Sequence, residues 1–147
     1  MQDATTATHA RLVKELVKAG KYNWQAFGGG DGTGPGVTKH GCVDFMRRWC
    51  SPEMQKAPMM MGAGEAHHMN QTVAAFLIAR PPIGFLGYGW ESDDKNWNDI
   101  FLLQAGTPKG LCKEESSGVF SREWSNGKAE LDCNQWTAAL PFPSLRM

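Results

Sequence analysis

The expected fold rests on residues 83–94, whose sequence is IGFLGYGWESDD. The first seven residues are apolar on both faces of a strand and include glycines that let another backbone come close, which is typical of a strand buried in a parallel sheet. Polarity changes abruptly at Trp90, because three of the next four residues carry carboxylates. The stretch therefore predicts a buried strand that ends in a polar loop.

Helices are expected on both sides of this strand. Apolar residues recur at helical spacing in residues 6–19, in residues 43–49 and in residues 65–79. Pro81 and Pro82 end the third of these helices. A further short helix is expected from about residue 97 to residue 103, where it begins in a segment rich in Asp and Asn, residue types that suit a helix N-terminus.

A second strand and a hairpin complete the expected elements. Residues 22–27 (YNWQAF) are expected to form a short aromatic-rich strand, followed by a glycine-rich loop at residues 28–41. Polar and apolar residues alternate in residues 119–124 and again in residues 128–133. The intervening residues 125–127 include Asn-Gly, which between alternating runs is a strong signal for a β-hairpin.

The order of helix, strand, helix, strand and helix predicts an α/β fold with an antiparallel β-hairpin added at the end. A chain of 147 residues fits one domain with its own core. Within this single domain, residues 1–147, we expect an α/β part in residues 1–110 and a C-terminal hairpin extension in residues 111–147.

Composition narrows the classes of partner. The formal net charge is zero and the basic residues are scattered, so nucleic acid is not an expected partner. No apolar run approaches the roughly 18 residues that a transmembrane helix needs. The first residues lack the basic start and apolar centre of a secretory signal.

The four cysteines fall into two local pairs along the chain. Cys42 and Cys50 lie on an expected helix and its exit, while Cys112 and Cys133 flank the expected hairpin. Disulfides within these pairs would indicate an oxidising secretory, extracellular or lumenal compartment. Free buried thiols are the alternative. No metal site is expected, because neither pair has CxxC spacing.

Two other motifs favour structural roles. The loop at residues 28–41 (GGGDGTGPGVTKHG) has neither a GxGxxG register nor a G-K-[ST] ending, so we do not expect it to bind phosphate or a nucleotide cofactor. The run Met59-Met60-Met61 could line a pocket or bind a soft metal, but filling gaps in the core is the favoured interpretation. No other cofactor is indicated.

Two longer strings resemble a known class of protein. Residues 74–90 (AAFLIARPPIGFLGYGW) resemble the last helix-strand passage of putative glycoside hydrolases built on a (β/α)8 barrel, and residues 118–133 (GVFSREWSNGKAELDC) are similar to the hairpin that follows that barrel. A complete barrel takes about 250 residues. The resemblance therefore implies the last part of a barrel, followed by its hairpin.

The resemblance and the strand pattern together suggest candidate site residues. If residues 22–27 and 83–89 are neighbouring parallel strands, the loops that follow them leave the same sheet edge and share one cleft. In that cleft Glu91 is the expected general acid or base, and Asp93 or Asp94 its partner carboxylate. A second interpretation stays open, in which Asp93 and Asp94 cap the next helix and Glu91 is solvated.

Substrate-binding residues are expected around the same cleft. Tyr88 and Trp90 provide aromatic rings on which a sugar could stack, and Asp31 is an alternative carboxylate from the glycine-rich loop. Trp24, on the first strand, is a candidate platform or a core residue. Trp124 and Trp136 are expected to cover the hairpin.

Three functional hypotheses follow from the sequence. The first is a truncated or degenerate glycoside-hydrolase-like domain that binds carbohydrate or hydrolyses a glycosidic bond. The second is a non-catalytic accessory subunit, because the open sheet edges of a partial barrel favour pairing with a protein partner. The third is a carbohydrate-binding module without catalysis, which requires exposed, coplanar aromatic rings.

Overall fold

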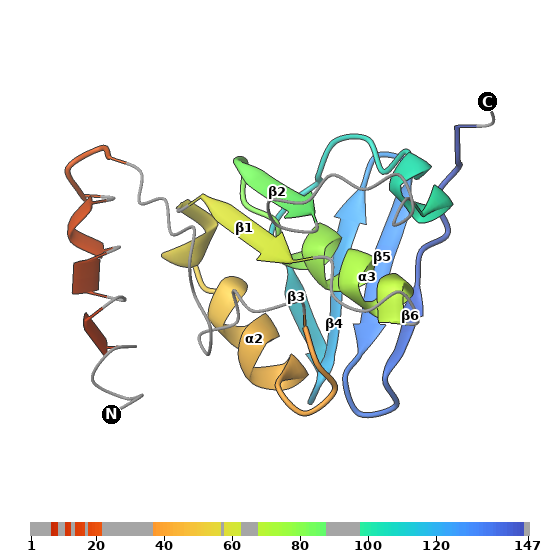
Figure 1. Ribbon diagram of the computed structural model, residues 1–147, viewed down its shortest axis with the longest axis horizontal. Helices are drawn as coiled ribbons and strands as arrows, with labels where there is room; N and C mark the ends of the chain where they lie inside the picture. The colour runs from red at the N-terminus through yellow and green to blue at the C-terminus, as the bar shows by residue number, and fades with distance from the viewer. Residues whose placement is uncertain are drawn as a thin grey trace.

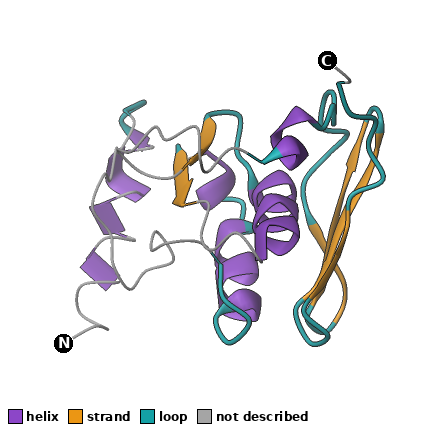
Figure 2. Cartoon of the chain, turned by 45° about the vertical axis from the view of Figure 1, so that its right-hand side comes forward, coloured by secondary structure: helices purple, strands orange, loops and turns teal. Residues whose placement is uncertain are grey.

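The structure is a computed structural model that describes residues 7–8, 11–12, 14–16, 18–21, 37–56, 58–62, 68–87 and 98–145. Its described part is mixed α/β, with a four-stranded antiparallel sheet and a two-stranded parallel sheet. Helix α3 (Met69–Ala79) lies between the two sheets, as Figures 1 and 2 show. The core sits on both sides of this helix, because nine of its eleven residues are buried.

The antiparallel sheet has the strand order β3-β4-β5-β6. Strands β4 (Val119–Trp124) and β5 (Gly127–Asp132) form the expected hairpin, with Phe120 opposite Leu131 and Trp124 opposite Gly127. Every second residue of β4 faces α3, so Phe120 and Trp124 are buried in the core. The sequence prediction of this hairpin is confirmed.

The hairpin turn differs in detail from the expected one. Because Gly127 already pairs with Trp124, only Ser125 and Asn126 occupy the turn. Neither has a positive φ, whereas the turns that favour Asn-Gly need one or two such residues. Gly127 is instead required by packing, since a Cβ there would lie 2.9 Å from the carbonyl oxygen of Pro141.

The sequence pattern missed both edge strands of this sheet. Strand β3 (Lys113–Ser116) is exposed along its whole length and β6 (Thr137–Ala139) has only three residues. Charged or short strands are common at sheet edges, where they discourage pairing with other chains. Neither strand shows the apolar alternation on which the prediction relied.

The parallel sheet is part of a strand-helix-strand unit. Strands β1 (Met59–Gly62) and β2 (Gly84–Gly87) pair in parallel from Met59↔Gly84 to Gly62↔Gly87, and α3 connects them. Gly84 faces the helix so closely that a Cβ would lie 2.8 Å from the Arg80 side chain. The methionine run therefore belongs to a strand, which the sequence did not predict, and its first and third residues fill the core.

The prediction of a fully buried strand at residues 83–89 is wrong for its described part. Strand β2 covers Gly84–Gly87, none of its residues is fully buried, and Phe85 is 53% exposed. Among the described elements, α3 packs on one side of this two-stranded sheet (Figure 2). The strand expected at residues 22–27 lies outside the described residues, and the described neighbour of β2 is β1.

Two shorter helices agree with the sequence in position. Helix α2 (Cys42–Trp49) buries the four residues Cys42, Phe45, Met46 and Trp49 on one side. Residues 99–102 form a 3-10 helix, η4 (Asp99–Leu102), rather than an α-helix, and the Asn98 side chain accepts a hydrogen bond from the backbone N–H of Ile100. A second 3-10 helix, η1 (Met54–Lys56), precedes β1.

Both disulfides are present, but the expected local pairing is wrong. Cys42 is bonded to Cys133 and Cys50 to Cys112, across sequence separations of 91 and 62 residues. The bonds attach the start and the end of α2 to the antiparallel sheet. They form across the chain because α2 and the sheet pack against one core, which sequence spacing alone could not show.

Candidate functional site

The candidate site lies at the carboxyl edge of the parallel strands. Gly62 and Gly87 are Cα partners at the ends of β1 and β2. The segments that follow these two residues therefore start from neighbouring points. In open parallel sheets, ligands bind outside the carboxyl ends of the strands, where such segments meet.

The two segments that start at this edge differ from the two loops that the sequence predicted. We expected the loop after residues 22–27 to meet the loop after residues 83–89, but β1 is the described neighbour of β2. Residues 63–67, which include Glu65 and His67, therefore follow the strand beside β2. Sequence reasoning missed these residues because it did not detect β1.

The sequence-predicted site residues lie outside the described residues. Tyr88, Trp90, Glu91, Asp93 and Asp94 follow within seven residues of Gly87, so chain continuity ties them to this edge. Trp24 and Asp31 also lie outside the described part. The roles assigned to all seven residues stay predictions.

The first turn of α3 is held by Trp136, next to the segment that follows β1. The Trp136 indole N–H donates to Nδ1 of His68 at 3.2 Å, and the two rings meet edge to face with centroids 5.7 Å apart. The Gln71 side chain donates to the Trp136 carbonyl oxygen at 2.9 Å. Trp136 also has a positive φ of 57°, which is uncommon for a bulky residue. These contacts fix where α3 begins relative to the sheet.

The C-terminus of α3, from which the chain turns into β2, is held by a buried arginine. The Arg122 guanidinium donates to the carbonyl oxygens of Ile78, Arg80 and Gly110. Its pKa is lowered by burial and by the nearby positive charge of Arg80. A cation at this end of a helix is favoured by the helix dipole and by the unpaired terminal carbonyl groups. Arg122 therefore helps to set the start of β2.

A second buried side chain supports the same helix end. The Gln55 amide nitrogen donates to the carbonyl oxygens of Trp49 and Ala79, both at 2.7 Å. It thus joins the C-termini of α2 and α3. Arg122 and Gln55 position the strands from the side opposite the candidate site, and neither role was visible in the sequence.

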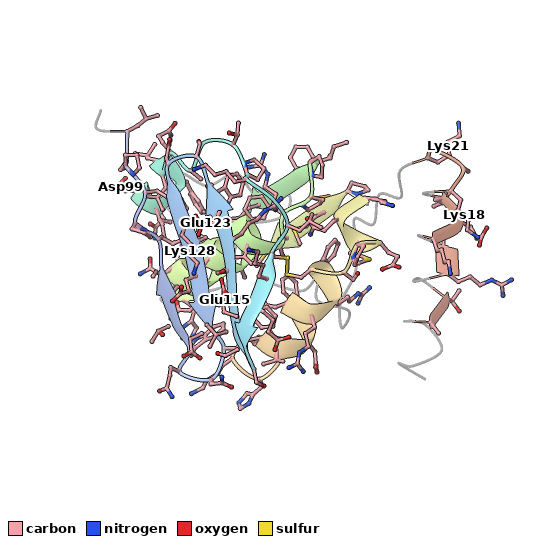
Figure 3. All side chains as sticks on the ribbon, turned by 180° about the vertical axis from the view of Figure 1, so that it is seen from behind. Lys18, Lys21, Asp99, Glu115, Glu123 and Lys128 are labelled. Carbon is pink, nitrogen blue, oxygen red and sulfur yellow. A yellow bond between two sulfur atoms is a disulfide. The ribbon has the colours of Figure 1, made fainter. Side chains whose placement is uncertain are left out.

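Several charged side chains on the described surface form ion pairs. On the outer face of the antiparallel sheet, shown in Figure 3, Lys128 lies 3.4 Å from Glu115 and 3.2 Å from Glu130. Arg47 of α2 makes a bidentate contact with Glu114 of β3, and this contact, with the Gly118 backbone N–H, lowers the pKa of Glu114 to about 2. The pKa of Glu115 is lowered as well, by its hydrogen bonds with Ser121 and Lys128.

Within the described residues, no group of three His, Cys, Asp or Glu side chains is placed to hold a metal ion. The same part of the chain contains no helix that is long and apolar enough to cross a membrane.

Comparison with known proteins does not assign the chain to a family. No family model matches the sequence, and no curated protein matches it significantly. The candidate function therefore rests on the geometry of the parallel strands and on the sequence resemblance described above.

Proposed function

We propose that this chain is a glycoside-hydrolase-like domain of partial-barrel type that binds carbohydrate at the carboxyl edge of β1 and β2. The observation that supports it is the β1–α3–β2 unit, whose two strands run parallel and end side by side at Gly62 and Gly87. This is the repeating unit of a (β/α)8 barrel, and active sites of such barrels lie at the carboxyl ends of the strands. The antiparallel sheet that follows is consistent with the C-terminal extension that the resemblance implies.

In this proposal the acidic segment after β2 supplies the chemistry. Glu91 acts as the general acid or base, and Asp93 or Asp94 acts as the partner carboxylate in hydrolysis of a glycosidic bond. Such reactions use two carboxyl groups about 5 to 9 Å apart, on opposite sides of the bond that breaks. Tyr88 and Trp90 provide rings for stacking, with Trp24 and Asp31 as further contacts from the other loop.

The test combines binding and turnover. The purified protein is screened against a panel of neutral and acidic polysaccharides, first for retardation in affinity electrophoresis and then for release of reducing ends. We expect Glu91→Gln to abolish release and to keep binding. Glu123→Gln is the matched control, because Glu123 is an exposed carboxylate on the outer face of β4.

The outcomes separate the hydrolase from the carbohydrate-binding module. Release that is lost in Glu91→Gln but kept in Glu123→Gln supports the hydrolase. Binding without release by the wild-type protein supports a carbohydrate-binding module. Absence of both binding and release rejects the proposed function.

The accessory-subunit hypothesis is the second candidate, and one observation favours it. The parallel sheet has two strands, so each strand has an unpaired edge in the described structure. Unpaired edges favour pairing with another chain. Gel filtration with mass spectrometry of the native particle tests it: a larger hetero-assembly supports an accessory role, and a monomer or small homo-oligomer contradicts it.

A further inference from the structure

Helix α3 presents one residue to solvent at its start. Nine of its eleven residues are buried, Gln71 is half-buried, and Asn70 is exposed. The buried residues lie between the two sheets, as Figure 2 shows. Asn70 is therefore the position on this helix where a bulky group can be attached without displacing the core.

Asn70 also begins an acceptor sequence for an N-linked oligosaccharide. Residues 70–72 are Asn-Gln-Thr, which matches the pattern Asn-X-Ser/Thr with X other than proline. None of the other five asparagines of the sequence is followed two positions later by Ser or Thr. The acceptor sequence thus occurs once, and its asparagine is the exposed residue of the helix.

The threonine of this sequence lies at a core position. Thr72 is 1% exposed, and the other buried residues of α3 are all apolar. Valine has nearly the same shape as threonine and carries no hydroxyl group to bury, so packing does not require a threonine there. Recognition by an oligosaccharyltransferase does require one, because the enzyme binds the hydroxyl group of the third acceptor residue.

The disulfides indicate the matching compartment. All four cysteines are paired, as Cys42–Cys133 and Cys50–Cys112. Disulfides form in oxidising compartments such as the lumen of the endoplasmic reticulum, where eukaryotic cells also add N-linked oligosaccharides. One compartment therefore accounts for both the disulfides and the acceptor sequence.

The acceptor sequence is accessible while the chain is being made. Gln71 donates to the Trp136 carbonyl oxygen across 65 residues, and the antiparallel sheet that covers α3 also follows it in the sequence. An isolated helix of eleven residues is marginal in water. Synthesis at about 5 to 20 residues per second leaves several seconds before Trp136 follows Gln71. During this time Thr72 is not yet buried.

We propose that Asn70 carries an N-linked oligosaccharide. In the transfer, the Asn70 side-chain nitrogen forms a bond to C1 of the first sugar of a polyprenyl-diphosphate-linked oligosaccharide, and the bond between C1 and the diphosphate oxygen breaks. The amide gives up one proton, and the polyprenyl diphosphate leaves with the bonding electron pair. The inference does not rest on the proposed function, since a chain that binds no carbohydrate can carry the same oligosaccharide.

The test is an intact-mass measurement before and after treatment with a peptide amidase that releases N-linked oligosaccharides. It is made on the protein from its native source and on the full chain directed into the secretory pathway of a eukaryotic cell by a cleavable leader, with secreted and retained protein pooled. We expect the amidase to remove the mass of an oligosaccharide and to leave aspartate in place of asparagine at position 70. Unmodified mass in either sample, or attachment at any other residue, overturns the proposal.

Three variants separate the acceptor sequence from the fold. Asn70→Gln and Thr72→Val should each abolish the amidase-sensitive mass, whereas Thr72→Ser should keep it, because serine also completes the acceptor sequence. The two Thr72 variants change the same buried position, so a folding defect common to both does not distinguish them. An oligosaccharide mass that persists in Asn70→Gln contradicts attachment at Asn70.

Discussion

Removing the Cys42–Cys133 disulfide tests the packing of α2 against the sheet in a quantitative way. The two disulfides are nested, since Cys50 and Cys112 lie between Cys42 and Cys133 in the sequence. With the inner bond closed, the outer bond closes a ring of about 30 residues, because 8 residues separate the first two cysteines and 21 the last two. The chain-entropy model assigns such a ring about 3.5 kcal/mol.

We therefore expect the Cys42→Ala/Cys133→Ala variant to lose about 3.5 kcal/mol of unfolding free energy. The same model gives about 4.3 kcal/mol for the 62-residue ring of the inner bond, so removing both bonds should cost about 8 kcal/mol. Urea titration without reductant measures these differences. The variant Cys50→Ala/Cys112→Ala is the matched control: with the outer bond intact, it should lose about 3.3 kcal/mol.

Peptide mapping gives an independent check of the pairing. Trypsin cuts after Arg47, Arg48, Lys113, Arg122 and Lys128, so the four cysteines separate into different peptides. Without reduction, the Cys42 peptide should remain joined to the Cys133 peptide. A Cys42–Cys50 linkage, or a loss below about 1 kcal/mol in the Cys42→Ala/Cys133→Ala variant, would refute the packing described above.

Three further predictions concern single residues. The contact with Arg47 lowers the pKa of Glu114 to about 2, so the contribution of this carboxylate to stability is complete above about pH 4.5 and is lost as the pH falls toward 2. We therefore expect Glu114→Gln to flatten the pH dependence of the unfolding free energy between these two pH values. An unchanged slope would contradict the ion pair. Arg122→Met removes the buried donor from three carbonyl groups, so we expect chemical denaturation to show a loss of about 3 kcal/mol. The control is Lys128→Met, which should be nearly neutral because Lys128 is partly exposed and makes only surface ion pairs. Gly106 has a φ of +81°, and a Cβ there would lie 1.9 Å from the Ser125 hydroxyl oxygen. We therefore expect Gly106→Ala to lower the melting temperature by several degrees. Gly87→Ala is the control and should change the melting temperature little, because a Cβ at Gly87 has no atom within 4 Å.

The elements that sequence predicted well are those whose local pattern and tertiary contacts agree. In the hairpin of β4 and β5, the residues Phe120, Trp124, Ala129 and Leu131 share the face toward α3, and the Asn-Gly sequence lies at the turn between the strands. The end of α3 is marked by Pro81 and Pro82, and its apolar residues recur at helical spacing. In both cases the residues that signal the element also bury its surface.

The elements that sequence missed take their structure from distant parts of the chain. Strand β1 is a methionine run with no alternation of polarity, and it becomes a strand because β2 pairs with it. The disulfide partners are separated by 62 and 91 residues, so nothing in the local spacing identifies them. The roles of Gln55 and Arg122 depend on the carbonyl groups at the end of α3, which no motif marks.

Disulfides and ion pairs are distributed unevenly between the described parts of the molecule. Helix α2 is joined to the antiparallel sheet by two disulfides and by the contact of Arg47 with Glu114. Strands β1 and β2 have neither a disulfide nor a described salt bridge, and four residue pairs hold them together. Local opening is easiest where buried contacts are fewest, and binding sites often occupy such regions. In the proposed function, the carboxyl edge of β1 and β2 therefore combines support from Arg122 and Gln55 at the other end of α3 with fewer cross-links between the two strands themselves.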